Sequence, residues 1–210
     1  IYNQSGASLI VSGGTVSSAD ERAIYNLGKL TVSGGDVSSG SSSAISNSGT
    51  ATISGGKVSA QIIGIINRSD AILTIKSGTI SCLAGNTITN YGTCNIEKDT
   101  NSYATITGNS KYPTIYNYEG TLSISAGKIS SEDQQVIVSD TKATLNISGN
   151  VEITTGNSTA VQTDGIFKLD GGTITNSSKT YATIVVVASK YTKTLGTIVN
   201  NGGGSTVGNK

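Results

Sequence analysis

A recurring phrase constrains the fold of this chain more than any other feature. Its clearest copy is AIYNLGKLTVSGGDV, residues 23–37, and degraded copies follow one another along the sequence. The residue two places after the first Ile or Val of each copy recurs at intervals of 20 to 27 residues: Asn3, Asn26, Asn47, Asn67, Asn90, Asn117, Ser139 and Thr163. A fixed supersecondary period of this length is typical of a solenoid.

Each copy of the phrase predicts three short strands. Ile24 and Asn26 point to one face and Tyr25 to the other, because side chains alternate across a strand. Leu30 and Val32 share the inward face of the next segment. A Gly-Gly pair then signals a turn, and a third strand begins with valine or isoleucine. We therefore predict an all-β fold, a single-stranded parallel β-helix with three strands per rung and eight or nine rungs.

The composition fits a narrow stack of strands. The 210 residues include 27 glycines, one Phe, and neither Trp nor Met, so the core must be built from Ile, Val and Leu. Rungs that stack ~4.8 Å apart bury such residues in one continuous core. We assign residues 1–199 to the β-helix domain. The Gly-rich tail, residues 200–210, is interpreted as a linker or an unfinished rung.

The recurring asparagines predict a hydrogen-bonded ladder. Asparagine tolerates left-handed turn geometry, and amides stacked in register can bond one another. At about 1 kcal/mol net per hydrogen bond, such a ladder sets the register of the rungs. The alternative is a polar groove for a ligand. The predicted ladder comprises Asn3, Asn26, Asn47, Asn67, Asn90 and Asn117.

One copy is longer than the others. Between Cys94 and Ile115 it reads CNIEKDTNSYATITGNSKYPTI, and its charged start holds Glu97, Lys98 and Asp99. We predict a protruding loop here. Insertions on one face of a solenoid are often binding sites, but a tolerated surface insertion is the better explanation of this sequence.

The two cysteines, Cys82 and Cys94, fall at inward positions of adjacent copies. They can form a disulfide, or they are two small buried apolar residues. With no His and only two thiols, a zinc site is not expected. We predict no cofactor and no bound metal.

Charge and hydropathy argue against two classes of partner. The net charge is +1, and the only arginines, Arg22 and Arg68, lie far apart, so no basic stripe for nucleic acid is expected. No apolar run approaches the ~20 residues of a membrane helix. The longest, residues 184–188, has the length of a strand.

The best carboxylate pair for chemistry is Asp140 with Asp164. Both follow the asparagine-equivalent position in successive copies, so stacking would bring them together, for polysaccharide cleavage or for a hard cation such as calcium. The alternative is two solvated turn residues. Since the chain lacks His and has few arginines, most general acids and bases are missing, and we predict a protein that is not an enzyme.

Hydroxyl columns offer another surface. Thr31, Thr52 and Thr74 lie at equivalent outward positions and could bind a carbohydrate or order water as ice-binding solenoids do. The column is interrupted, among other places, by Ile10 and Asn95, so a soluble polar strand face is the alternative. Outward tyrosines can stack on sugars, but the copies between them carry Ser, Ile and Thr.

Three copies, AIYNLGKLTVSGGDVSS, AISNSGTATISGGKVSA and TIYNYEGTLSISAGKISS, resemble the repeats of bacterial cell-surface β-helix proteins, including adhesin-like proteins and, more distantly, autotransporter passenger domains. The resemblance covers roughly residues 1–174. It implies a secreted, surface-attached, right-handed parallel β-helix that serves as a stalk, an adhesin or a filament. No catalytic motif of such proteins maps onto this chain.

We therefore expect a non-catalytic extracellular module of a bacterial surface protein. Its expected partners are surface glycans, proteins of host or neighbouring cells, or further copies stacked end to end. The runner-up functions are a carbohydrate-binding or polysaccharide-degrading β-helix and an ice-binding solenoid. The chain begins inside a copy of the phrase and shows no obvious cap, so we expect either a segment of a longer chain or a filament subunit.

Overall fold

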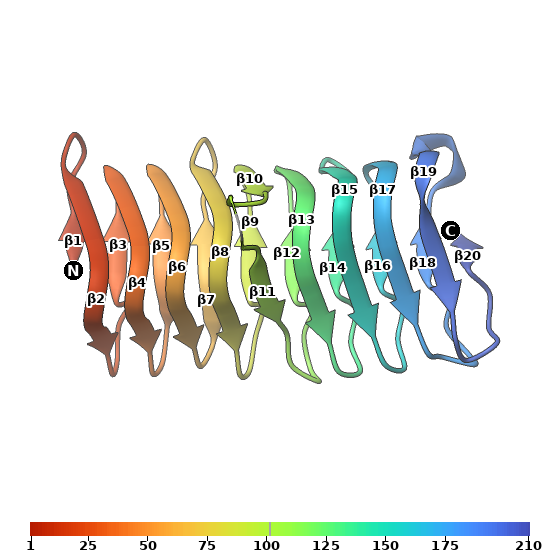
Figure 1. The fold of residues 1–210 in the computed structure, drawn as a ribbon, viewed down its shortest axis with the longest axis horizontal. Coiled ribbons are helices and arrows are strands. Elements are labelled where there is room, and N and C mark those ends of the chain that lie inside the picture. The colour runs from red at the N-terminus through yellow and green to blue at the C-terminus, as the bar shows by residue number, and fades with distance from the viewer. Residues whose placement is uncertain (101) are drawn as a thin grey trace.

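The chain winds into a right-handed β-solenoid of about nine turns (Figure 1). The structure is a computed structural model that describes residues 1–100 and 102–210. The long strands on the near side all run one way and the short strands behind them run the other way, while the chain advances from one end of the rod to the other. All strand pairs are parallel, with the same residue of each copy in register, for example Asn26 with Asn47. The predicted parallel β-helix is confirmed.

The first sheet consists of the short strands that carry the recurring asparagines. Its ten strands follow one another in chain order along the rod. They are β1 (Tyr2–Asn3), β3 (Ile24–Asn26), β5 (Ser43–Asn47), β7 (Ile63–Asn67), β9 (Ile88–Asn90), β12 (Ile115–Asn117), β14 (Ile137–Ser139), β16 (Val161–Thr163), β18 (Ile184–Val186) and β20 (Val207–Asn209).

The second sheet consists of the long strands, and one of its layers is split into two short strands by the insertion. Each strand pairs with the equivalent strands of the turns before and after it. They are β2 (Ser8–Ser18), β4 (Lys29–Ser39), β6 (Thr50–Ala60), β8 (Ile72–Cys82), β10 (Thr93–Ile96) with β11 (Ala104–Thr107), β13 (Thr121–Ser131), β15 (Thr144–Thr155), β17 (Ile166–Asn176) and β19 (Tyr191–Asn200).

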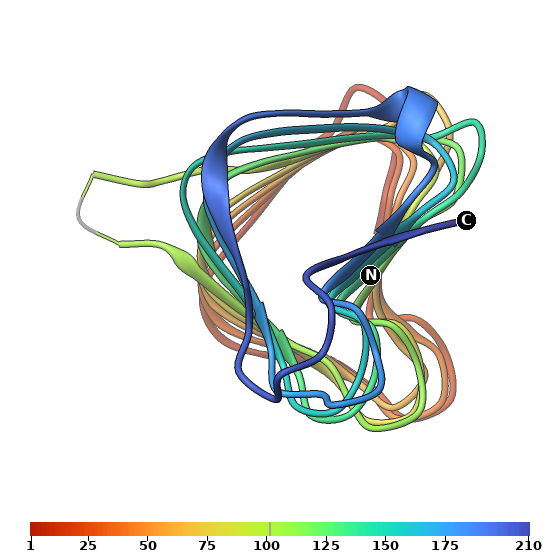
Figure 2. The ribbon, with the colours of Figure 1, turned by 90° about the vertical axis from the view of Figure 1, so that its right-hand side faces the viewer.

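The predicted second and third strands of a rung form one continuous strand that bends at the glycine pair. At Gly35 the angle φ is 75°, and a Cβ atom there would lie 2.6 Å from the carbonyl oxygen of Gly14. Only glycine combines this left-handed geometry with so close an approach of two backbones. Figure 2, which views the rod end-on, shows the three-sided cross-section, in which the two arms of the long strand form two of the sides.

The apolar positions of the repeat form one continuous core. Ile24, Leu30, Val32 and Val37 are completely buried, as are their counterparts in most later turns. Phe167 is the largest fully buried side chain, and it occupies the position held by leucine in several other turns. The core is therefore a narrow column of Ile, Val and Leu, as the composition predicted.

The asparagine ladder is present. The Nδ2 of each asparagine from Asn3 to Asn90 donates to the Oδ1 of the next one, with donor–acceptor distances of 2.6 to 2.9 Å. Asn117 donates to the Oγ of Ser139 at 3.1 Å. Asn67 also donates to the carbonyl oxygens of Ala71 and Thr93, at 3.3 and 2.9 Å, so the ladder ties the first sheet to the second.

The ends of the chain remain part of the same coil. In the tail, β20 pairs with β18, so residues 207–209 add a strand to the first sheet. A short 3₁₀ turn, η1 (Ala188–Lys190), precedes β19. Across residues 1–100 and 102–210, no helix is long and apolar enough to cross a membrane.

Candidate binding surfaces

The residue after each ladder position forms a second column, on the outside of the solenoid. In five successive turns, its backbone N–H donates to the carbonyl oxygen of the ladder residue one turn earlier, at 2.8 to 3.0 Å. These repeated bonds place the side chains of the five turns one above another. The column runs through Arg68, Tyr91, Tyr118, Asp140 and Asp164.

Three tyrosines make an aromatic cluster in the middle of this column. The ring centroids of Tyr91 and Tyr118 are 5.2 Å apart, and Tyr116 of β12 adds a third ring 5.8 Å from that of Tyr118. Tyr91 and Tyr118 are 36% and 42% exposed. Exposed rings held side by side are a common platform for sugars and for apolar side chains, because they offer a large rigid surface with polar rims.

A hollow lies at each end of the aromatic cluster. One, with a volume of about 300 Å³, is lined by Arg68 and Tyr91 together with residues of β7 and β9. The other, of about 360 Å³, is lined by Tyr118, Asp140 and Lys142 with their neighbours. We call this surface the tyrosine strip and define it as Arg68, Tyr91, Tyr116, Tyr118 and Asp140.

The predicted carboxylate pair occupies successive turns, but each carboxylate has its own partner. The hydroxyl of Tyr116 donates to Asp140 at 3.1 Å, and burial, followed by the charge of Asp140, raises the pKa of Tyr116. Asp164 forms an ion pair of 2.6 Å with the ammonium of Lys210. Among the described residues, no three His, Cys, Asp or Glu side chains are grouped so as to hold a metal ion.

The threonine column is in register as predicted. Thr31 pairs with Thr52, and Thr52 with Thr74, and all three are half-buried. Ile10 pairs with Thr31 and Asn95 pairs with Thr74, so other residue types end the threonine column after three turns. A longer hydroxyl column lies on the second arm of the long strands, where the paired residues are Ser17, Ser38, Ser59, Ser81, Thr107, Ser130, Thr154 and Thr175.

The two cysteines do not form a disulfide. Both are buried and free. Cys94 pairs in register with Leu73, at the start of β8, whereas Cys82 is the last residue of that strand. Both cysteines occupy inward positions of adjacent turns, as predicted. Cys94 lies at the level of the start of β8, however, and Cys82 lies at its end. Burial raises the pKa of both thiols, that of Cys94 to about 12.

The predicted loop leaves the bend of the long strands and points away from the rod (Figure 2). It connects β10 to β11, and Asn101 within it lies outside the described residues. At its base, Glu97 forms an ion pair of 3.4 Å with Lys76 of the preceding turn.

Sequence reasoning considered the position after the ladder residue only for Asp140 and Asp164 and looked for tyrosines inside each first-sheet strand, so it missed the tyrosine strip. The signal was one position later, where Arg68, Tyr91, Tyr118 and Asp140 occupy four successive copies. No protein-family model matches this chain, and no curated protein or solved structure is significantly similar to it.

Proposed function

We propose that this chain is a non-catalytic, extracellular β-solenoid of a bacterial surface protein, which acts as an adhesive rod. The tyrosine strip is the observation that carries the adhesive role. Its exposed rings and charged ends stand on a scaffold whose core and ladder run through the turns beneath it. Partners of this kind of surface are glycans or proteins of a host or neighbouring cell.

The scaffold supports the mechanical half of the proposal. Parallel pairing joins every turn to the next through both sheets, and the buried asparagine amides add a third line of bonds along the axis. Bending the rod would stretch these bonds and open a close-packed core, which makes it a stiff support. A stalk or filament role rests on the same property.

Adhesion of coated beads tests the proposal. Beads that carry the protein should adhere to a panel of bacterial and epithelial cells, and the double variant Tyr91→Ala/Tyr118→Ala should lose most of that adhesion. The matched control is Tyr112→Ala/Tyr181→Ala, which removes two tyrosines of similar exposure, 47% and 50%, outside the strip. Equal adhesion of the two double variants would contradict the adhesive strip.

The competing enzymatic function predicts a different result. If Asp140 and Asp164 cleaved polysaccharide, the protein would release reducing sugar from acidic or neutral polysaccharides, and Asp164→Asn would abolish the release. Our proposal predicts no release by either protein.

A further inference from the structure

Two departures from the repeat meet at one place on the rod. The insertion between β10 and β11 interrupts the long strand at its bend. Two turns further on, β15 has 12 residues, where β4, β6, β8, β13 and β17 each have 11, and its pairing with β13 and β17 takes up the extra residue at the same bend. Bulges of this kind redirect side chains and are frequent beside binding sites.

Residues of the two departures and of the strands beside them line an open cleft of about 570 Å³. This is inside the range of roughly 300–1,000 Å³ that is usual for pockets that hold small ligands. Tyr103, at the end of the insertion, is half exposed and lines the cleft. Glycines of three successive turns also line it and contribute no side chain: Gly127, Gly149 and Gly172.

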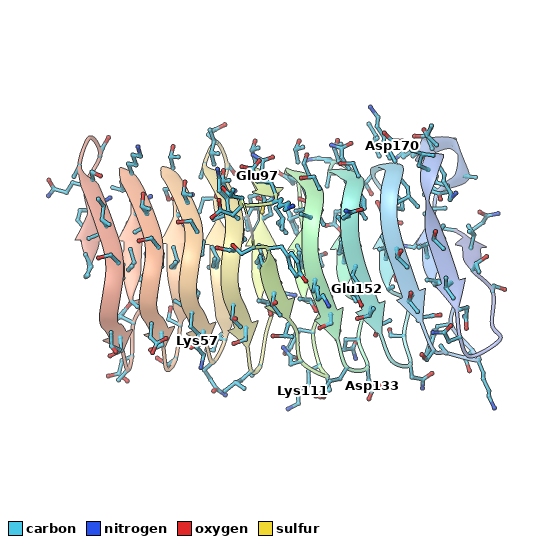
Figure 3. The ribbon with its side chains drawn as sticks, viewed as in Figure 1. Lys57, Glu97, Lys111, Asp133, Glu152 and Asp170 are labelled. Atoms are coloured by element: carbon cyan, nitrogen blue, oxygen red, sulfur yellow. The ribbon has the colours of Figure 1, made fainter. Side chains whose placement is uncertain are left out.

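The polar groups of the cleft come from β13, β15 and β17. Lys128 and Glu152 form an ion pair of 3.3 Å between adjacent turns, with about half of each side chain exposed. Asn150, which belongs to the bulge, and Thr173 of the next turn add an amide and a hydroxyl. Figure 3 labels Glu97, which follows β10, and Glu152 of β15. Strand β13 lies between β10 and β15 in the second sheet.

We propose that this cleft, which we call the corner cleft, binds a neutral oligosaccharide. The ring of Tyr103 would stack on one sugar face, and the amide of Asn150, the carboxylate of Glu152 and the ammonium of Lys128 would exchange hydrogen bonds with the sugar hydroxyls. The lining charges cancel, since Lys128 is already paired with Glu152, so an anionic ligand gains little there.

The lining disfavours other ligands. Among the described residues that line the cleft, Val151 alone has an aliphatic side chain larger than that of alanine, so the cleft offers an apolar ligand little to bury against. An extended peptide would need a free strand edge, but β13, β15 and β17 are paired on both sides. The corner cleft and the tyrosine strip are formed by different residues, so the two can be tested separately.

The test is titration of the intact chain with cellotetraose, xylotetraose, mannotetraose and chitotetraose, followed by NMR of the asparagine side-chain amides. We expect at least one of these to bind and to shift the amide signals of Asn150. Tyr103→Ala should weaken binding at least about tenfold, since the stacked ring supplies much of the contact, whereas Tyr103→Phe should retain it. A tetragalacturonate of the same length should bind more weakly than the best neutral sugar.

The control is Tyr112→Ala, an equally exposed tyrosine on the same long copy, which should leave binding unchanged. Unfolding curves of each variant establish that the fold is intact. Absence of binding to all four neutral sugars, unchanged binding by Tyr103→Ala, or tighter binding of tetragalacturonate would each overturn the inference. The double variant Tyr91→Ala/Tyr118→Ala should not alter this titration. A failure of the bead-adhesion test would therefore not change the sugar titration, and the two proposals can fail separately.

Discussion

The stretch from β4 to β8 and the stretch from β10 to β17 are built on the same core but differ on their surfaces. In the first stretch, three long strands have 11 residues each and the ladder residue is always asparagine. In the second, an insertion splits one long strand, a bulge lengthens another, and Ser139 and Thr163 hold the ladder position in two turns. Leu30 in the first and Leu122 in the second are nevertheless equally and completely buried.

The difference teaches how such a rod can acquire binding surfaces. Each turn contributes to the core through inward residues and to the outside through alternate ones, so a change outside leaves the stack intact. Most of the tyrosine strip and all of the corner cleft belong to the irregular stretch. The variants described below probe the two stretches and, with Gly14, the turn before them.

The largest effect is expected at Cys94, which lies in the core directly before the insertion. Burial raises the pKa of its thiol from the usual 9.0 to about 12, so at pH 9 the thiolate fraction is roughly 500-fold lower than in the unfolded chain. Alkylation by iodoacetamide should therefore be extremely slow in the native protein, should accelerate as the pH rises toward 12, and should become fast on unfolding. Rapid native alkylation at pH 9 would show that the insertion loosens the core.

A substitution in the ladder should destabilise the regular stretch more than the irregular one. Asn67→Ala removes its bonds to Asn47, Asn90 and two carbonyl oxygens, and should lower the free energy of unfolding by about 3 kcal/mol. Ser139→Ala removes one hydrogen bond, from Asn117, and should lower it by about 1 kcal/mol. Urea unfolding measures both values, and equal losses would contradict the ladder's role.

Two glycines with the same backbone angle separate the effect of conformation from that of close approach. Gly14 and Gly56 have φ of 70° and 73°, but a Cβ at Gly14 meets nothing within 4 Å, whereas at Gly56 it would lie 2.5 Å from the carbonyl oxygen of Gly35. Gly14→Ala should cost about 1 kcal/mol, the strain of the left-handed conformation alone. Gly56→Ala should cost about 2 kcal/mol or more, because the bent backbone must also move. Similar losses would mean that the turns do not pack closely at the bend.

The smallest effect on stability is expected in the corner cleft. Tyr103 is half exposed and stands outside the core, so Tyr103→Ala should change the free energy of unfolding by no more than about 0.5 kcal/mol. The same urea titration measures it. A loss of unfolding free energy as large as that of Asn67→Ala would show that the insertion contributes to the stability of the rod.

The sequence allowed the core and the ladder to be predicted because both depend on a local pattern repeated many times. Alternation identified Leu30 and Val32 as inward, and stacking identical turns then placed asparagine above asparagine. The bend was harder to interpret. A Gly-Gly pair is a turn signal, but here β4 continues through the bend, and its residues pair with β6 on both sides of the bend.

The two candidate binding surfaces depend on information that the repeat does not contain. Tyr103 reaches the corner cleft because the insertion leaves and rejoins the same long strand, and no periodicity predicts that path. The bulge at Asn150 is one extra residue, too small a change to recognise in copies of 20 to 27 residues. The disulfide alternative was wrong for a related reason, since alternation tells which residues point inward but not which end of the strand they occupy.

Side-chain amide hydrogen exchange, followed by NMR, tests the central claim most directly. The ladder amides of Asn67 and Asn90 are completely buried and bonded to their neighbours, whereas Asn150 is exposed in the corner cleft. We expect the Nδ2 protons of the two ladder residues to exchange only through unfolding, orders of magnitude more slowly than those of Asn150. Exchange of the ladder amides as fast as that of Asn150 would contradict a buried asparagine ladder as the spine of this rod.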